Sequence, residues 1–96
     1  INRIEGVDDA PFESPITWTG TKVSLVELIY ALQASGALNN GDAEIRLIAT
    51  NFEKFFNVSL GQIYRSFQEI QLRKKNQTVF LDEMKQFLIK RLEANQ

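Results

Sequence analysis

The chain of 96 residues contains no cysteine and no histidine. These absences exclude disulfide bonds, metal sites with cysteine or histidine ligands, a cysteine nucleophile and any catalytic triad with a histidine base. No apolar run approaches the roughly 20 residues that a membrane-spanning helix needs, and the mixed polar start at residues 1–5 is unlike a signal peptide. We therefore expect no membrane-spanning segment in this chain.

The charge of the chain is unevenly divided. The formal net charge is -1, but residues 1–58 hold 4 basic and 8 acidic side chains, whereas residues 59–96 hold 7 and 4. A basic half favours an anionic partner, although a division of this size is also typical of an ordinary solvated surface. Because 44% of the residues are apolar, a chain of this length can form one domain with its own core.

The first 15 residues differ in composition from the rest. They are acidic, contain Pro11 and Pro15, and show no helical periodicity, so we predict a linker that arrives from a domain further upstream. The adjacent carboxylates of Asp8 and Asp9 are more typical of solvated linker residues than of a metal site.

Residues 16–96 are predicted to form one domain. It begins with a β-prone segment at residues 16–19, which predicts an isolated strand or an extended arm. Trp18 is expected to anchor this segment onto the helices. Six phenylalanines at helical spacing are predicted to lie in the core: Phe52, Phe55, Phe56, Phe67, Phe80 and Phe87.

The first predicted helix covers residues 22–35. Apolar residues recur there at the spacing of one helix face: Leu25, Leu28, Ile29 and Leu32. Thr21 is the expected N-cap, and a capping box of Ser24 and Glu27 is the alternative if the helix begins later. Gly36 is expected to end the helix in the left-handed conformation.

The second predicted helix follows a turn at Asn39-Asn40-Gly41, whose residues all tolerate positive φ. Asp42 is its expected N-cap. Its apolar face is the most regular in the chain: Ile45, Ile48, Ala49, Phe52, Phe55 and Phe56. Asn57 is expected to end this helix with positive φ.

Two further helices complete the domain. The third is predicted over residues 59–75 and begins with a capping box of Ser59 and Gln62. The fourth is predicted from near residue 78 to about residue 93. Its apolar side chains are expected to face inward: Phe80, Leu81, Met84, Phe87, Leu88 and Leu92.

The short joint between the second and third helices favours a helix-turn-helix over residues 42–75. Only about three residues, Asn57-Val58-Ser59, join the two helices, so they should cross at a steep angle. The first helix of this motif is longer by about one turn than in the commonest repressor pattern. In this motif the second helix enters the major groove of DNA, which makes the third helix of the chain the candidate recognition helix.

The candidate DNA-binding residues lie on the polar face of that helix and at its basic end: Ser59, Gln62, Arg65, Ser66, Glu69, Arg73, Lys74 and Lys75. Glutamine pairs with adenine and arginine with guanine through two hydrogen bonds, while lysine and arginine contact phosphates. The same residues are also compatible with an ordinary solvated face and with cations that oppose the helix dipole.

The scattered carboxylates of Glu27, Glu44 and Glu53 have no supporting base, so we predict no enzyme.

Several stretches carry a more specific pattern: residues 18–22, 28–32 and 34–41, then Phe67, residues 73–76, Thr78 and residues 80–82. From Trp18 onward the chain resembles the C-terminal domain of the RteC family, regulators carried by conjugative transposons of gut bacteria. The resemblance implies a cytoplasmic regulator with a helical N-terminal domain and a C-terminal helix-turn-helix or winged-helix-like domain. It implies binding to a promoter-proximal DNA site and activation of genes for excision of the element. The implied binding surface is the third helix with Arg73, Lys74 and Lys75.

The sequence thus predicts a mainly α domain of about four helices, helix-turn-helix or winged-helix-like, with at most a minimal short β element. Any wing strand would come from residues 16–18 or from around residues 37–39, because residues 76–78 lead directly into another helix. We expect binding of double-stranded DNA without catalysis, cofactor, metal, membrane or small-molecule ligand, and a homodimer remains open. The alternative is a protein-interaction or dimerisation module, which would expose an apolar groove.

Overall fold

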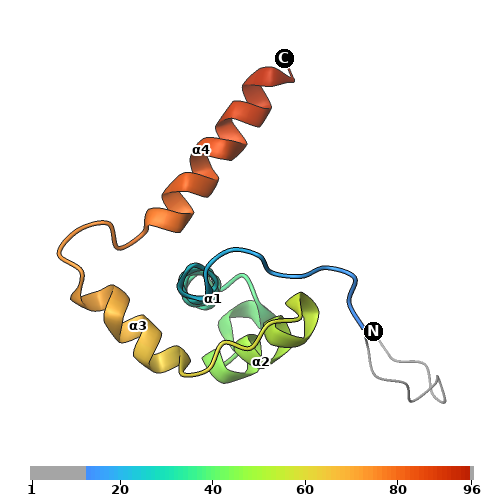
Figure 1. Cartoon of the computed structure of the whole chain (residues 1–96), viewed down its shortest axis with the longest axis vertical. Coiled ribbons are helices and arrows are strands. Elements are labelled where there is room, and N and C mark those ends of the chain that lie inside the picture. The colour runs from blue at the N-terminus through green and yellow to red at the C-terminus, as the bar shows by residue number, and fades with distance from the viewer. Residues whose placement is uncertain (1–12, 96) are drawn as a thin grey trace.

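A computed structural model describes residues 13–95, which form four α-helices and one short 3-10 turn (Figure 1). The elements in chain order are α1 (Lys22–Ser35), η1 (Asn39–Gly41), α2 (Ile45–Phe56), α3 (Ile63–Leu72) and α4 (Val79–Ala94). No strand occurs within residues 13–95, so the predicted mainly α fold is confirmed. Asp8, Asp9 and most of the predicted linker lie outside the described residues.

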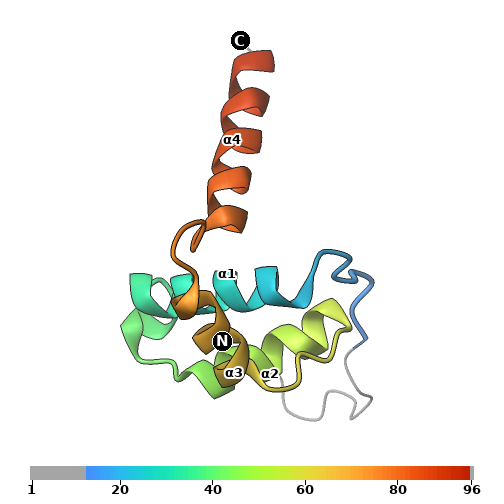
Figure 2. The same ribbon diagram turned by 60° about the vertical axis from the view of Figure 1, so that its left-hand side comes forward.

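The central helix of the fold is α1, and α2, α3 and α4 all pack against it. Figure 2 shows α1 lying across the molecule, with α2 and α3 on one side and α4 leaving on the other. Leu25, Val26 and Ile29 of α1 are the most deeply buried side chains, each no more than 1% exposed. Residues from the other elements complete the core: Ala43, Ile48, Ala49, Leu60, Ile63 and Ile70. Burial of each large apolar side chain contributes roughly 1.5–3 kcal/mol to stability.

Both ends of α1 follow the sequence prediction. The Thr21 hydroxyl accepts a hydrogen bond from the Ser24 amide at 3.1 Å, and the helix begins at Lys22. The alternative capping box of Ser24 and Glu27 is therefore excluded. Gly36 ends the helix with φ of 77°, a conformation that glycine adopts without a steric cost.

The segment before α1 is an extended arm anchored by Trp18, as one of the two sequence alternatives stated. The Trp18 amide donates to the Phe56 carbonyl at 2.8 Å, and its indole N–H donates to the Thr21 carbonyl at 2.8 Å. The indole ring meets the rings of Phe56 and Phe80 edge to face, with centroids 5.6 and 5.7 Å away. Within residues 13–95 neither this arm nor residues 37–39 supply a wing strand.

The turn before α2 forms as predicted, but the predicted N-cap is wrong. Asn39, Asn40 and Gly41 have φ of 50°, 55° and 85°. The Asp42 amide donates to the Asn39 carbonyl at 3.0 Å, which makes Asp42 the last residue of the turn. Consequently α2 begins only at Ile45, and no side chain caps it.

At the other end of α2, Asn57 ends the helix in the left-handed conformation, with φ of 52°, as predicted. Its side-chain amide also donates to the carbonyls of Ser14 and Ile16, both at 2.9 Å. One residue therefore ends α2 and holds the N-terminal arm against it.

The predicted three-residue joint between α2 and α3 is wrong, because residues 57–62 all lie between the two helices. The chain stays extended after Asn57 so that Leu60 reaches the core, where it is 5% exposed. The Leu60 amide donates to the Glu53 carboxylate at 2.7 Å, which gives this buried backbone group a charged acceptor. Burial of Leu60 thus lengthens the connection beyond that of the predicted motif.

The start of α3 is also displaced from its predicted position. Gly61 has φ of 70°, which interrupts any helix that would begin at Ser59. The helix runs over Ile63–Leu72, and the side chain of its N-cap residue, Gln62, forms no capping hydrogen bond. The predicted capping box of Ser59 and Gln62 and the predicted helix over residues 59–75 are therefore wrong.

A residue of α1 caps the first turn of α4. The Glu27 carboxylate accepts hydrogen bonds from the amides of Phe80 at 3.3 Å and Leu81 at 2.8 Å. Glu27 is only 6% exposed, and the N-cap residue of α4, Thr78, forms no capping hydrogen bond of its own. This contact fixes the base of α4 on α1.

Beyond its base, α4 extends away from the other helices, so its predicted inward-facing side chains are largely exposed (Figures 1 and 2). The exposed fractions are 38% for Met84, 67% for Phe87, 59% for Leu88 and 56% for Leu92. The core prediction therefore fails for Phe87, and it also fails for Phe55, which is 40% exposed. The other phenylalanines are partly buried: Phe52, Phe56, Phe67 and Phe80. The hydrogen bonds to α1 lie in the first turn of α4, and the helix leads away from α1 beyond it, so most of its apolar stripe is uncovered.

Candidate nucleic-acid interface

The inner face of α3 fixes which of its residues point to solvent. Ile63 and Ile70 are 3% and 6% exposed, and the Phe67 ring stacks on the Tyr30 ring of α1 with centroids 3.8 Å apart and planes 6° from parallel. Burial, and then the nearby phenol of Tyr64, raises the pKa of Tyr30 above its ordinary value of 10.0. The stack therefore stays uncharged at neutral pH. Because these contacts set the rotation of α3, its opposite face is directed outward.

The predicted polar residues of α3 are largely brought together on that outward face. Gln62, Arg65 and Glu69 are exposed and lie at helical spacing along one side. Ser66 is half-buried at the edge of this face, and Ser59 is exposed in the connection before α3. We call the exposed residues of this side the α3 outer face: Gln62, Arg65, Gln68, Glu69 and Leu72.

The basic cluster at residues 73–75 lies in a loop rather than in the helix. Arg73 is the C-cap residue of α3, and its guanidinium donates to the Asn76 carbonyl at 3.1 Å. The Gln77 side-chain amide donates to the Gln71 carbonyl at 3.0 Å, which holds the loop against the end of α3. Lys74 and Lys75 are exposed between these two anchors. The loop thus presents two ammonium groups next to the α3 outer face.

Sequence reasoning missed several residues at this surface. Arg46 of α2 lies over the ring of Tyr64 on α3, with its Cζ atom 5.7 Å from the ring centroid, which is within cation–π range. Gln68 is exposed on α3, and Leu72 is 81% exposed at the end of its outer face. The polar position of Arg46 on α2 signalled exposure, but its proximity to α3 depends on how both helices pack on α1.

The charge around α3 favours an anion. Residues 59–78 hold 4 basic side chains against one acidic side chain, Glu69, and α2 adds the cation of Arg46 and the carboxylate of Glu53, which accepts from the Leu60 amide. The first turn of α3 has no side-chain cap, so its free N–H groups and the helix dipole also favour negative charge. Within residues 13–95 no three acidic side chains gather in a way that could hold a metal ion. The arrangement is suited to contact with a polyanion along one helix and one loop.

The sequence matches the RteC protein family over residues 3–96. The chain belongs to the RteC family. This match covers nearly the whole chain and confirms the family resemblance noted from the sequence. Family membership suggests a regulator related to the excision of conjugative transposons. No curated protein and no solved structure matches the chain.

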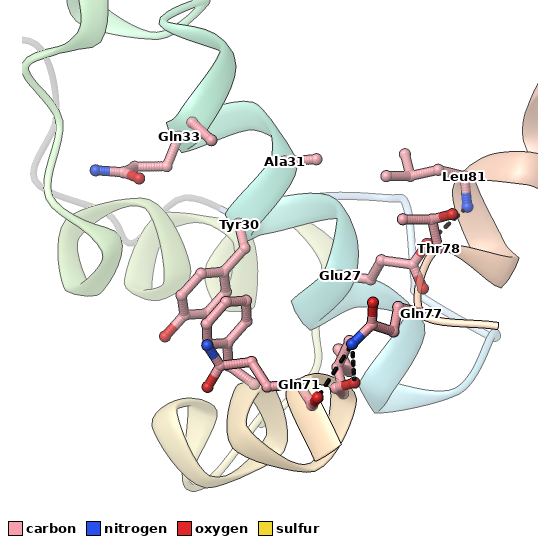
Figure 3. Close-up of a pocket in the computed structure, with 11 residues that line it drawn as sticks. Glu27, Tyr30, Ala31, Gln33, Gln71, Gln77, Thr78 and Leu81 are labelled. Carbon is pink, nitrogen blue, oxygen red and sulfur yellow. Dashed lines mark hydrogen bonds between the residues drawn. The ribbon is translucent and has the colours of Figure 1, made fainter. Parts of the chain in front are cut away.

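A second surface feature of this RteC-family chain is an apolar groove beside α3. It has a volume of about 500 Å³ and lies between α1, α3 and the base of α4 (Figure 3). Tyr30, Ala31, Ile70 and Leu81 are among its lining residues, and Glu27 lies at its edge with its carboxylate bound to the α4 amides. No helix among the described residues is long and apolar enough to cross a membrane.

Proposed function

We propose that the chain binds double-stranded DNA through the α3 outer face and the loop at residues 73–78, without catalysis or cofactor. The single observation that carries this proposal is the exposure of Arg65 on α3 and of Lys74 and Lys75 in the loop directly after it, while Phe67 on the other side of α3 stacks on Tyr30 of α1. In the cytoplasm, such a domain would act in transcriptional regulation of the excision and mobilisation genes of a conjugative transposon, as family membership suggests.

The residues divide into two roles. Gln62 and Arg65 lie near the N-terminal end of α3, where a recognition helix approaches base edges, and each matched contact is worth roughly 1–3 kcal/mol of discrimination. Arg73, Lys74 and Lys75 contact phosphates, which position the helix and make affinity depend on salt. Arg46 joins this second group from α2. Ser66 and Glu69 lie along the walls of the DNA major groove. Ser59 and Gly61 let the connection before α3 approach the DNA backbone closely.

The first experiment is a mobility shift of the 96-residue chain on the regulatory region of its element, at two salt concentrations. We expect binding that weakens as salt rises, because counterions are released when phosphates are contacted. The Arg65→Ala, Lys74→Ala double variant should lose at least tenfold in affinity. The matched control is Lys22→Ala, Lys54→Ala, which removes the same charge from exposed positions on α1 and α2. Absence of binding at low salt, or equal losses in both double variants, would contradict the proposal.

The second candidate function is a protein-interaction or dimerisation module. The observation that favours it is the exposed apolar stripe of α4, which is separate from the basic surface around α3. The two functions therefore use different surfaces and are compatible in one chain.

A further inference from the structure

Leu72, the last residue of α3, is the most exposed large apolar residue among those that the structure describes, at 81%. It lies two residues after the buried Ile70, just as Arg65 lies two residues after the buried Ile63. Two residues turn a helix by about 200°, so Leu72 and Arg65 both lie opposite the core. A leucine therefore occupies the centre of the α3 outer face, where a merely solvated helix would carry a polar side chain.

The neighbours of Leu72 along the chain are polar or charged. Gln68 and Glu69 lie one turn earlier on α3, and the basic cluster at residues 73–75 follows directly. The other exposed large apolar residue of α3, Tyr64, lies more than two turns away. The apolar groove beside α3 is lined by other residues of this helix and not by Leu72. One leucine among such neighbours is far smaller than the several hundred Å² of an apolar protein-docking patch.

The polar neighbours of Leu72 match the base edges in the major groove of DNA. Arginine pairs with guanine and glutamine with adenine, and a carboxylate such as that of Glu69 accepts from the amino group of cytosine. Because the Glu69 carboxylate would repel a phosphate, this part of α3 fits base edges better than the DNA backbone. The one apolar group that base pairs present in this groove is the C5-methyl group of thymine, which apolar side chains contact.

We propose that Leu72 contacts the C5-methyl group of a thymine and makes the chain select thymine at one position of its DNA site. The inference rests on the proposed function, in which the α3 outer face enters the major groove. Leu72 follows Arg65 by seven residues, which is about 10.5 Å along the helix axis. Base pairs follow one another at about 3.4 Å. A helix that runs along the groove therefore places this thymine about three base pairs from the base that Arg65 reads.

Deoxyuridine tests the contact, because it pairs with adenine as thymidine does but lacks the C5-methyl group. In a mobility shift of the 96-residue chain at one fixed salt concentration, each thymine of the bound site is replaced in turn by deoxyuridine. One replacement should weaken binding about fourfold, the effect of burying one methyl-sized group. It should lie about three base pairs from the position at which Arg65→Ala loses discrimination.

Variants of Leu72 show whether this side chain reads the methyl group. Leu72→Ala should bind the thymine and deoxyuridine sites equally, whereas Leu72→Met keeps a long apolar side chain and should retain the preference for thymine. Leu47→Ala is the matched control, because it removes the same atoms from a leucine of α2 that is 52% exposed and lies outside the α3 outer face. This control should retain both the affinity and the preference. The Tm of Leu72→Ala should not fall, since Leu72 lies outside the core.

Two results would overturn the thymine contact and leave the proposed DNA binding intact. One is a chain that binds its site equally well with thymine and with deoxyuridine at every position. The other is a Leu72→Ala variant that keeps the original preference for thymine. If Leu72→Ala weakens binding although the original chain shows no such preference, the leucine contacts protein or the minor groove instead. Absence of any binding at low salt would contradict the proposed function and the thymine contact together.

Discussion

Glu27 lies on α1, yet its carboxylate accepts hydrogen bonds from the Phe80 and Leu81 amides at the start of α4. Its position in the sequence suggested either a capping box for its own helix or an ordinary carboxylate. The structure instead buries it to 6% exposure and uses it as the cap of a helix more than 50 residues away. A sequence pattern cannot reveal this role, because it depends on the path of the intervening chain.

Removal of this cap should destabilise the junction of α1 and α4. We expect Glu27→Ala to lower the free energy of unfolding by about 1–3 kcal/mol, since it leaves two backbone amides without their acceptor. Urea unfolding measures the loss, and hydrogen exchange at the Phe80 and Leu81 amides should accelerate. Glu44→Ala is the control, because Glu44 is exposed and forms no capping bond. Equal stability of the two variants would show that the cap contributes nothing.

At the scale of elements, the ends of helices divide into those that sequence predicts well and those that it does not. Thr21, Gly36 and Asn57 end or begin their helices as predicted, because each acts through its own backbone conformation or an immediate neighbour. Asp42 and Ser59 do not cap their predicted helices, because tertiary contacts hold the adjacent segments in non-helical conformations. Asp42 closes a turn, and the residues after Ser59 carry Leu60 into the core.

The connection before α3 should be sensitive to its glycine. A side chain at Gly61 would meet no atom within 4 Å, so only the backbone conformation, with φ of 70°, resists substitution. Gly61→Ala should destabilise the chain by about 1 kcal/mol and lower Tm by roughly 5 °C, while Gly61→Asn should cost less because asparagine tolerates positive φ. Thermal unfolding of the two variants checks the order. A higher Tm for the alanine variant than for the asparagine variant would contradict the assigned strain.

At the scale of the whole molecule, α1 acts as a scaffold between two surfaces. Figure 2 shows α3 on one side of α1 and α4 extending from the other. A near-neutral chain has little general attraction for DNA, so the local cations around α3 and the pairing of two copies would have to supply the affinity. If the chain also acts as a dimerisation module, pairing through α4 would present two α3 helices related by a two-fold axis.

Such a dimer should favour an inverted repeat over a single half-site. Footprinting on the regulatory region of the element should reveal two protected half-sites with a fixed spacing. Leu88→Arg should weaken binding to the pair at least tenfold and leave binding to one half-site unchanged. Gln86→Arg, which adds the same charge, should behave like the original chain on both. Equal affinity of the original chain for the pair and for one half-site would exclude a role of the dimer in DNA recognition.

The sequence by itself determined the class of fold, the approximate spans of α1, α2 and α4, and the family. It could do so because helical periodicity, glycine and asparagine stops and the family pattern are local properties of the chain. The site was partly predictable for the same reason: helical spacing put Gln62, Arg65 and Glu69 on one side, and Lys74 and Lys75 were visible as a basic run.

Only the tertiary structure decided how these parts are arranged. It placed Arg46 beside α3, moved the start of α3 to Ile63, and turned Glu27 into the cap of α4. It also left the stripe of α4 in solvent, although the same pattern predicted a core helix. The physical reason is that periodicity indicates which side of a helix is apolar. Whether another helix packs on that side depends on how the helices are arranged around α1.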